Sequence, residues 1–107
     1  MAVLEINGEK FKEIISTSEN AVIQMSASWC MTCAKMLPLF EEVSNNADYK
    51  NITFAYIELD DEDDIVEKYF IRGVPVFLFF KNGEVIDRII GDSSSKELQD
   101  FINKNIK

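Results

Sequence analysis

The sequence contains no histidine, only two cysteines and one tryptophan, and few glycines and prolines. Without an imidazole, the chain cannot perform Ser-His-Asp or Cys-His catalysis. Four glycines and two prolines beside 47% hydrophobic residues exclude a collagen-like, low-complexity or disordered chain. No apolar stretch approaches the roughly 18 residues that a membrane-spanning helix needs. Residues 1–6 lack the basic and hydrophobic regions of a signal peptide. We therefore expect a globular chain that is neither exported nor inserted in a membrane.

Positive charge is scarce as well. The chain has 11 Lys and Arg against 19 Asp and Glu, a net charge of −8. So few cations cannot neutralise phosphate, which excludes nucleic acids and anionic membranes as partners. A protein partner is instead expected to be basic or apolar. Two cysteines close together are also too few for the disulfide scaffold of a secreted domain. The expected location is the cytoplasm.

The length of 107 residues matches one domain, and no repeat or linker divides residues 1–107. Hydrophobic patterning predicts five strands, at residues 3–6, 21–27, 52–59, 76–80 and 85–90. It also predicts four helices. The first covers residues 8–16, the second runs from residue 30 or 31 to about 45, the third starts with residues 60–64, and the fourth follows Ser94. The predicted order is β-α-β-α-β-α-β-β-α. This order predicts an α/β fold with a central mixed sheet and helices on both faces.

Local signals fix several ends of these elements. Asn7 is expected to cap the first helix, and Asn82-Gly83 to form a type I′ hairpin turn. Ser94 and Glu97 have the spacing of a capping box at the start of the last helix. The short third helix is expected to present an apolar face made of Ile65, Val66, Tyr69 and Phe70.

A Cys-x-x-Cys motif, Trp29-Cys30-Met31-Thr32-Cys33, falls where the second strand leads into the second helix. Two intervening residues at a helix start bring two sulfurs within bonding distance. The first sulfur then lies at the positive end of the helix dipole, which favours the thiolate. Cys30 is therefore the candidate nucleophile. Cys33, one turn into the helix on its buried face, is the candidate resolving cysteine.

The same spacing has two other interpretations. It occurs in half of a zinc or iron–sulfur site, but a closed site needs four ligands. Because this chain offers two thiols and no imidazole, a metal site would have to be shared by two copies. An inert structural pair is the other alternative, although it leaves the position at a strand-to-helix junction unexplained.

A second candidate feature is Gly73-Val74-Pro75, directly before the strand at 76–80. A proline in this place marks either a sheet edge or a cis peptide in a tight turn. Because only about one X-Pro bond in twenty is cis, spacing alone does not decide between them.

Several segments in the same order resemble the thioredoxin family over almost the whole chain. They are Ala27-Ser28-Trp29-Cys30-x-x-Cys33, Lys35-Met36-Leu37-Pro38, Tyr69-Phe70-Ile71-Arg72-Gly73-Val74-Pro75, Phe79-Phe80-Lys81-Asn82-Gly83-Glu84 and Gly91. The resemblance implies a thioredoxin fold and reduction of protein disulfides by dithiol exchange. It also implies a cis Pro75 lying against the cysteine pair.

The resemblance further implies an apolar docking face for substrates. Together with Met31 and Thr32 of the motif, its residues would be Trp29, Leu59, Val74, Pro75, Ile90 and Gly91. Val74 would offer its backbone to an extended substrate segment, as in β-strand addition. The implied partners are disulfide-containing proteins and a thioredoxin reductase. NADPH would act through that reductase, and no cofactor or metal would bind this chain, which is expected to be a monomer.

Three positions depart from the family pattern. The usual Gly-Pro between the cysteines is Met31-Thr32, and Met31 can widen the docking face because methionine adapts to varied partners. The buried aspartate behind the cysteines is Gln24, and the lysine that accompanies it is Tyr56. Glutamine cannot titrate. One interpretation is a neutral core pair in which Tyr56 hydrogen-bonds Gln24. The other is a proton relay to Cys33 through water or the Tyr56 hydroxyl.

Two rival functions remain open at this stage. The altered dipeptide could make the chain a disulfide oxidase or isomerase, although the expected lack of a signal peptide argues against an oxidising compartment. Alternatively, the chain is a protein-binding module of thioredoxin fold in which disulfide exchange is secondary.

Overall fold

The computed structural model describes residues 3–106, so Met1, Ala2 and Lys107 lie outside the description, including the start of the segment 1–6 considered above. The elements are β1 (Val3–Ile6), α1 (Gly8–Thr17), β2 (Asn20–Ser26), α2 (Met31–Ser44), the 3-10 turn η1 (Ala47–Tyr49), β3 (Thr53–Glu58), α3 (Asp63–Lys68), β4 (Val76–Lys81), β5 (Glu84–Ile90) and α4 (Ser95–Asn105). Their order confirms the predicted sequence of strands and helices.

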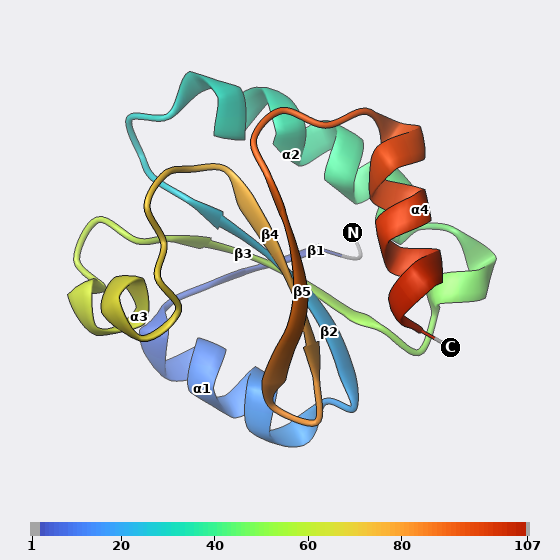
Figure 1. Cartoon of the computed structure of the whole chain (residues 1–107), viewed down its shortest axis with the longest axis horizontal. Helices are drawn as coiled ribbons and strands as arrows, with labels where there is room; N and C mark the ends of the chain where they lie inside the picture. The colour runs from blue at the N-terminus through green and yellow to red at the C-terminus, as the bar shows by residue number, and fades with distance from the viewer. Residues whose placement is uncertain (1–2, 107) are drawn as a thin grey trace.

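The five strands form one mixed sheet in the order β1-β3-β2-β4-β5. β1, β3 and β2 run parallel, whereas β4 pairs antiparallel with β2 and β5 with β4. Parallel neighbours need crossover helices, and these helices cover both faces of the sheet (Figure 1). The mixed sheet is therefore confirmed.

Each face of the sheet carries its own apolar core. One core joins the sheet to α1 and α3 through Phe11, Ile14 and Ile65. The other joins it to α2 and α4, with Phe40 and Phe101 among its buried side chains. Figure 1 shows α1 and α3 on one side of the strands and α2 and α4 on the other. Because both faces are covered, the central strands β2 and β4 are almost entirely buried, as their apolar sequences predict.

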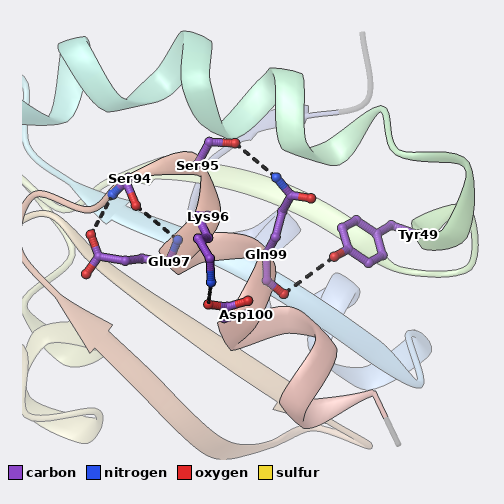
Figure 2. Close-up of polar contacts among 7 residues, drawn as sticks. All are labelled: Tyr49, Ser94, Ser95, Lys96, Glu97, Gln99 and Asp100. Carbon is purple, nitrogen blue, oxygen red and sulfur yellow. Dashed lines mark hydrogen bonds and ion pairs between the residues drawn. The ribbon is translucent and has the colours of Figure 1, made fainter.

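The predicted caps and hairpin are confirmed. The Lys10 backbone N–H donates to Asn7 Oδ1 at 2.9 Å, at the start of α1. Asn82 and Gly83 have φ values of 52° and 86°, the positive pair that a type I′ turn requires. At the start of α4, Ser94 and Glu97 exchange hydrogen bonds of 2.9 and 3.1 Å, as Figure 2 shows. This reciprocal capping satisfies two N–H groups that the helix cannot pair internally.

The third helix differs from the sequence prediction in two ways. It begins at Asp63, so Asp60 lies before the helix rather than opening it. It also ends at Lys68, and Phe70 is exposed rather than part of the apolar face. Ile65 and Tyr69 are buried as expected. The spacing of apolar residues fits a longer helix, but the chain turns after Lys68 and carries Phe70 outward.

Within residues 3–106, no helix combines the length and hydrophobicity that crossing a bilayer requires.

Candidate active site

The two cysteines meet at the junction of β2 and α2. Cys30 is the N-cap residue of α2, and Cys33 lies in its first turn. Their sulfurs form a disulfide, with the two Cα atoms 5.3 Å apart. The spacing argument for a bonded pair is therefore confirmed.

The two sulfurs have different surroundings. Cys33 is fully buried, whereas Cys30 retains 8% of its surface. The Cys33 backbone N–H donates to Cys30 Sγ at 3.1 Å, so the sulfur occupies the acceptor position of an N-cap. This N–H and the positive end of the helix both stabilise negative charge on the Cys30 sulfur. On reduction, this arrangement favours a thiolate at Cys30 and leaves Cys33 shielded.

The loop before β4 closes over Cys30. The Val74–Pro75 peptide bond is cis, as the family resemblance implies. Cys30 Sγ lies 3.9 Å from the Val74 carbonyl oxygen. The Gly91 N–H donates to the Pro75 carbonyl at 2.9 Å and joins this loop to the end of β5. The chain thus brings Cys30, Val74, Pro75 and Gly91 together from segments far apart in sequence.

The residues expected to form the docking face lie around this junction. Trp29, Leu59 and Val74 line one pocket of about 280 Å³. Of these lining residues, Trp29 is 74% exposed, whereas Leu59 is buried. The other expected residues lie outside that pocket. Met31 and Thr32 are exposed at the start of α2, and Pro75 is buried directly before β4. Ile90 is exposed at the end of β5, and Gly91, which follows it, is half-buried. Exposed apolar side chains therefore lie directly before and after Cys30 in the chain, at Trp29 and Met31, and at the end of β5, at Ile90.

The sequence interpretation missed the residue pair that fixes the loop before Cys30. Asp60 accepts the Ser28 N–H at 2.9 Å and the Ser28 hydroxyl at 2.6 Å. These bonds tie the segment preceding Trp29 to the end of β3. Sequence analysis placed Asp60 at the start of the third helix and proposed no contact for it, although its position directly after the strand that pairs with β2 was the available signal.

We expect the Ser28–Asp60 contact to make the loop sensitive to acid. The two hydrogen bonds from Ser28 hold the pKa of the Asp60 carboxyl below its usual value. Because the pKa of Asp60 is lower in the folded than in the unfolded protein, its ionised carboxylate stabilises the fold. This stabilisation is complete above the unfolded-state pKa and is lost as the pH falls through the folded-state pKa. We expect Trp29 fluorescence to change in that acidic range. Asp60→Asn should remove this transition, and an unchanged transition in the variant would contradict the assignment.

Behind Cys33, Gln24 is fully buried. Its Nε2 donates to the Cys33 carbonyl at 3.0 Å and to Ser26 Oγ at 3.2 Å. The carbonyl can only accept, so it fixes the orientation of the amide. Gln24 Oε1 is buried and has no hydrogen-bond partner among residues 3–106. The position behind the cysteines that the family resemblance implied for Gln24 is confirmed.

The predicted direct bond between Gln24 and Tyr56 is not what the structure contains. The two residues are paired in register on β2 and β3, but Tyr56 hydrogen-bonds Ser26 instead. Ser26 is therefore shared by both side chains, and sequence reasoning missed it because a lone serine carries no spacing signal. Burial raises the pKa of Tyr56, and the charge of Glu58 adds to this effect, whereas the Ser26 bond opposes it. Tyr56 thus remains a neutral phenol at neutral pH.

The part of the chain that the structure describes contains no group of three or more cysteine or carboxylate side chains that could hold a metal ion. Within one copy, the cysteine pair is arranged for sulfur chemistry.

Comparisons with known proteins agree with this geometry. The Thioredoxin family model matches residues 2–104. The thioredoxin of Buchnera aphidicola subsp. Baizongia pistaciae is 33% identical over 106 residues, which cover 98% of this chain and 96% of that protein. The thioredoxin of Mycoplasmoides gallisepticum is 32% identical over 96 residues, covering 90% and 94%. The solved structure of Malassezia sympodialis thioredoxin matches with a TM-score of 0.86 at 30% identity, covering 98% of this chain and 91% of that one.

A disulfide-capable Cys-x-x-Cys pair at a helix start, a five-stranded mixed sheet and a match to the family model over residues 2–104 agree with one another. The chain therefore belongs to the thioredoxin family and is a protein-disulfide oxidoreductase that acts through a redox-active cysteine pair.

Proposed function

We propose that this protein reduces disulfides of other proteins, with Cys30 as nucleophile and Cys33 as resolving cysteine. The observation that carries this assignment is the position of Cys30 Sγ, which accepts the Cys33 N–H at the start of α2 while keeping part of its surface exposed. An attacking sulfur must be both ionised and reachable. Cys33, fully buried one turn away, is reachable only by its neighbour Cys30.

The reaction proceeds in two exchanges. The Cys30 thiolate attacks one sulfur of the substrate disulfide, so that a mixed disulfide forms and the other substrate sulfur leaves as a thiolate. The Cys33 thiol then loses its proton, which is passed through solvent to the released substrate thiolate, and the Cys33 sulfur attacks Cys30 Sγ. The Cys30–Cys33 bond forms, the mixed disulfide breaks, and the second substrate sulfur leaves. Two electrons have passed from the cysteine pair to the substrate.

The surface around Cys30 supplies the docking face. Trp29, Met31 and Ile90 are large exposed apolar side chains, and exposed apolar groups gathered beside a reactive sulfur favour an apolar protein surface. The Val74 carbonyl lies beside Cys30 Sγ and offers backbone hydrogen bonding to an extended substrate segment. Thr32, Leu59, Pro75 and Gly91 complete the proposed face.

We place the protein in the cytoplasm as a monomer of one domain. There a thioredoxin reductase would return two electrons to the Cys30–Cys33 disulfide, with NADPH as the ultimate donor. The net charge of −8 supports protein partners rather than nucleic acids.

The test is the reduction potential of the Cys30–Cys33 couple, measured by equilibration in glutathione buffers and counting of alkylated thiols by mass. We expect a value below about −250 mV, in the range of cytosolic reductants. A value above about −200 mV would instead identify an oxidase or isomerase. A pair that never closes under oxidising buffers would leave only a protein-binding role.

A further inference from the structure

Phe70 occupies a backbone position that suits glycine. The Ile71 N–H donates to the Val66 carbonyl at 3.0 Å and closes the end of α3 around Phe70, which has a φ of 55°. This is the position after a helix end where glycine is usual, because an L side chain meets steric cost in the left-handed region. The side chain of Phe70 is 70% exposed, so burial does not offset that cost. An aromatic residue held outward at the expense of stability points to a role in binding.

Two neighbouring pockets lie between Trp29, beside the active site, and Phe70. A pocket of about 280 Å³ extends from Trp29 along Val66, Ile71 and Arg72. A second pocket of about 440 Å³ shares those last three residues and ends at Phe70 and Glu67. The two pockets adjoin at these three residues, and we call them together the Trp29–Phe70 groove. Its lining is more apolar than polar, and each pocket is lined by one exposed aromatic residue, Trp29 in the first and Phe70 in the second.

The charged groups of the groove are two acids and one base. Asp60 lines the half near Trp29, Glu67 lines the half near Phe70, and Arg72 lines both. Within the described chain none of the three forms a salt bridge. Residues 60–64, which precede or begin α3, are all acidic, and the whole chain carries −8. A second copy of this chain would be repelled by that charge, whereas a basic segment would be attracted.

We propose that the Trp29–Phe70 groove is a docking site for the segment of a partner protein that flanks its disulfide. This segment places a large apolar side chain between Trp29 and Phe70 and a Lys or Arg beside Glu67. The inference rests on the proposed function, because the groove reaches Cys30 through its neighbours Trp29 and Val74. It assigns substrate selection to Phe70, a residue outside the docking face described above.

The test uses synthetic peptides that carry one cysteine as a mixed disulfide with a chromogenic aromatic thiol. Near the cysteine, one series has Phe with Lys beside it, a second has Ser with Lys, and a third has Phe with Glu. We expect the Phe–Lys peptide to be reduced with the lowest KM. In Phe70→Gly and Phe70→Asn, which both suit a left-handed backbone, kcat/KM for this peptide should fall roughly tenfold through KM. The rate with the free chromogenic disulfide should not change.

A matched control is Ile86→Ala, because Ile86 is 46% exposed yet lines neither pocket. This variant should keep the wild-type peptide preference. The melting temperature of Phe70→Gly should equal or exceed that of the wild type, which separates lost binding from lost folding. Equal KM values for wild type and both Phe70 variants would overturn the proposal. Preference for the Phe–Glu peptide would also overturn it, as would a wild-type dimer that dissociates in Phe70→Gly, because the groove would then bind a second copy of this chain. Failure of wild type to reduce any of these disulfides would instead reject the proposed function.

Discussion

The Cys30→Ser variant is expected to lose protein-disulfide reduction, with turnover at least about a thousandfold below wild type. A serine hydroxyl at the start of α2 remains protonated at neutral pH, so no nucleophile occupies the place where Cys30 Sγ accepts the Cys33 N–H. Cys33 cannot replace it, because its side chain is fully buried. Reduction of a disulfide-bonded test protein by the variant, recycled with dithiothreitol, measures the loss.

The matched variant is Cys33→Ser, which removes the other sulfur and preserves Cys30. It should still attack substrate once, and the mixed disulfide at Cys30 should then accumulate because no resolving thiol follows. Intact mass before and after added thiol detects that adduct. Accumulation in Cys30→Ser rather than in Cys33→Ser would contradict the assigned roles. Because both variants lack the disulfide, their stabilities should be compared with that of the reduced wild type.

The features predicted best from the sequence are those determined by neighbours along the chain. Cys30 and Cys33 are three residues apart at a strand-to-helix junction, and that spacing alone places one sulfur at the cap and the other inside. Asn82-Gly83 is similarly local, since only residues that tolerate positive φ fit the tight hairpin.

The features that sequence reasoning missed depend on contacts between distant segments. Ser26 becomes the shared partner of Gln24 and Tyr56 only because β2 and β3 pair in a particular register. Ser28 and Asp60 meet because those same strands end side by side. A serine can hydrogen-bond in almost any setting, so its sequence context did not single out either residue.

Phe70 shows a different limit. Its spacing from Val66 satisfies the helical pattern, yet the helix ends at Lys68 and the chain reverses through a left-handed residue. Apolar periodicity reports which residues could share a face, but not where a short helix stops. The cis Val74–Pro75 bond is a third case, since the family resemblance implied it and residue spacing did not.

The Gln24→Asp variant tests what a neutral amide behind Cys33 does to the resolving step. A carboxylate at this buried position can take the Cys33 proton, which the glutamine amide cannot do. We therefore expect Gln24→Asp to speed turnover near neutral pH, with the gain appearing as pH rises through the pKa of the new carboxyl. Single-turnover decay of the mixed disulfide, followed between about pH 5 and 9, measures the resolving step directly.

The same substitution should also cost stability in a pH-dependent way. Burial raises the pKa of a carboxyl, and a rise of about two units corresponds to roughly 3 kcal/mol. The pKa of the new carboxyl is higher in the folded than in the unfolded protein. The loss in free energy of unfolding is therefore absent below the unfolded-state pKa and complete above the folded-state pKa. Denaturant unfolding of the oxidised protein at about pH 4 and pH 8 should reveal the difference.

Gln24→Asn is the matched control, because asparagine and aspartate have the same length and differ in charge. Both variants shorten the side chain that donates to the Cys33 carbonyl and to Ser26, so both lose those contacts to a similar extent. A faster, pH-dependent resolving step in Gln24→Asp but not in Gln24→Asn isolates proton transfer. If the two variants resolve the mixed disulfide at the same rate at every pH, the proton of Cys33 leaves by a route that does not involve position 24. Gln24 then acts only by holding the first turn of α2 through the Cys33 carbonyl.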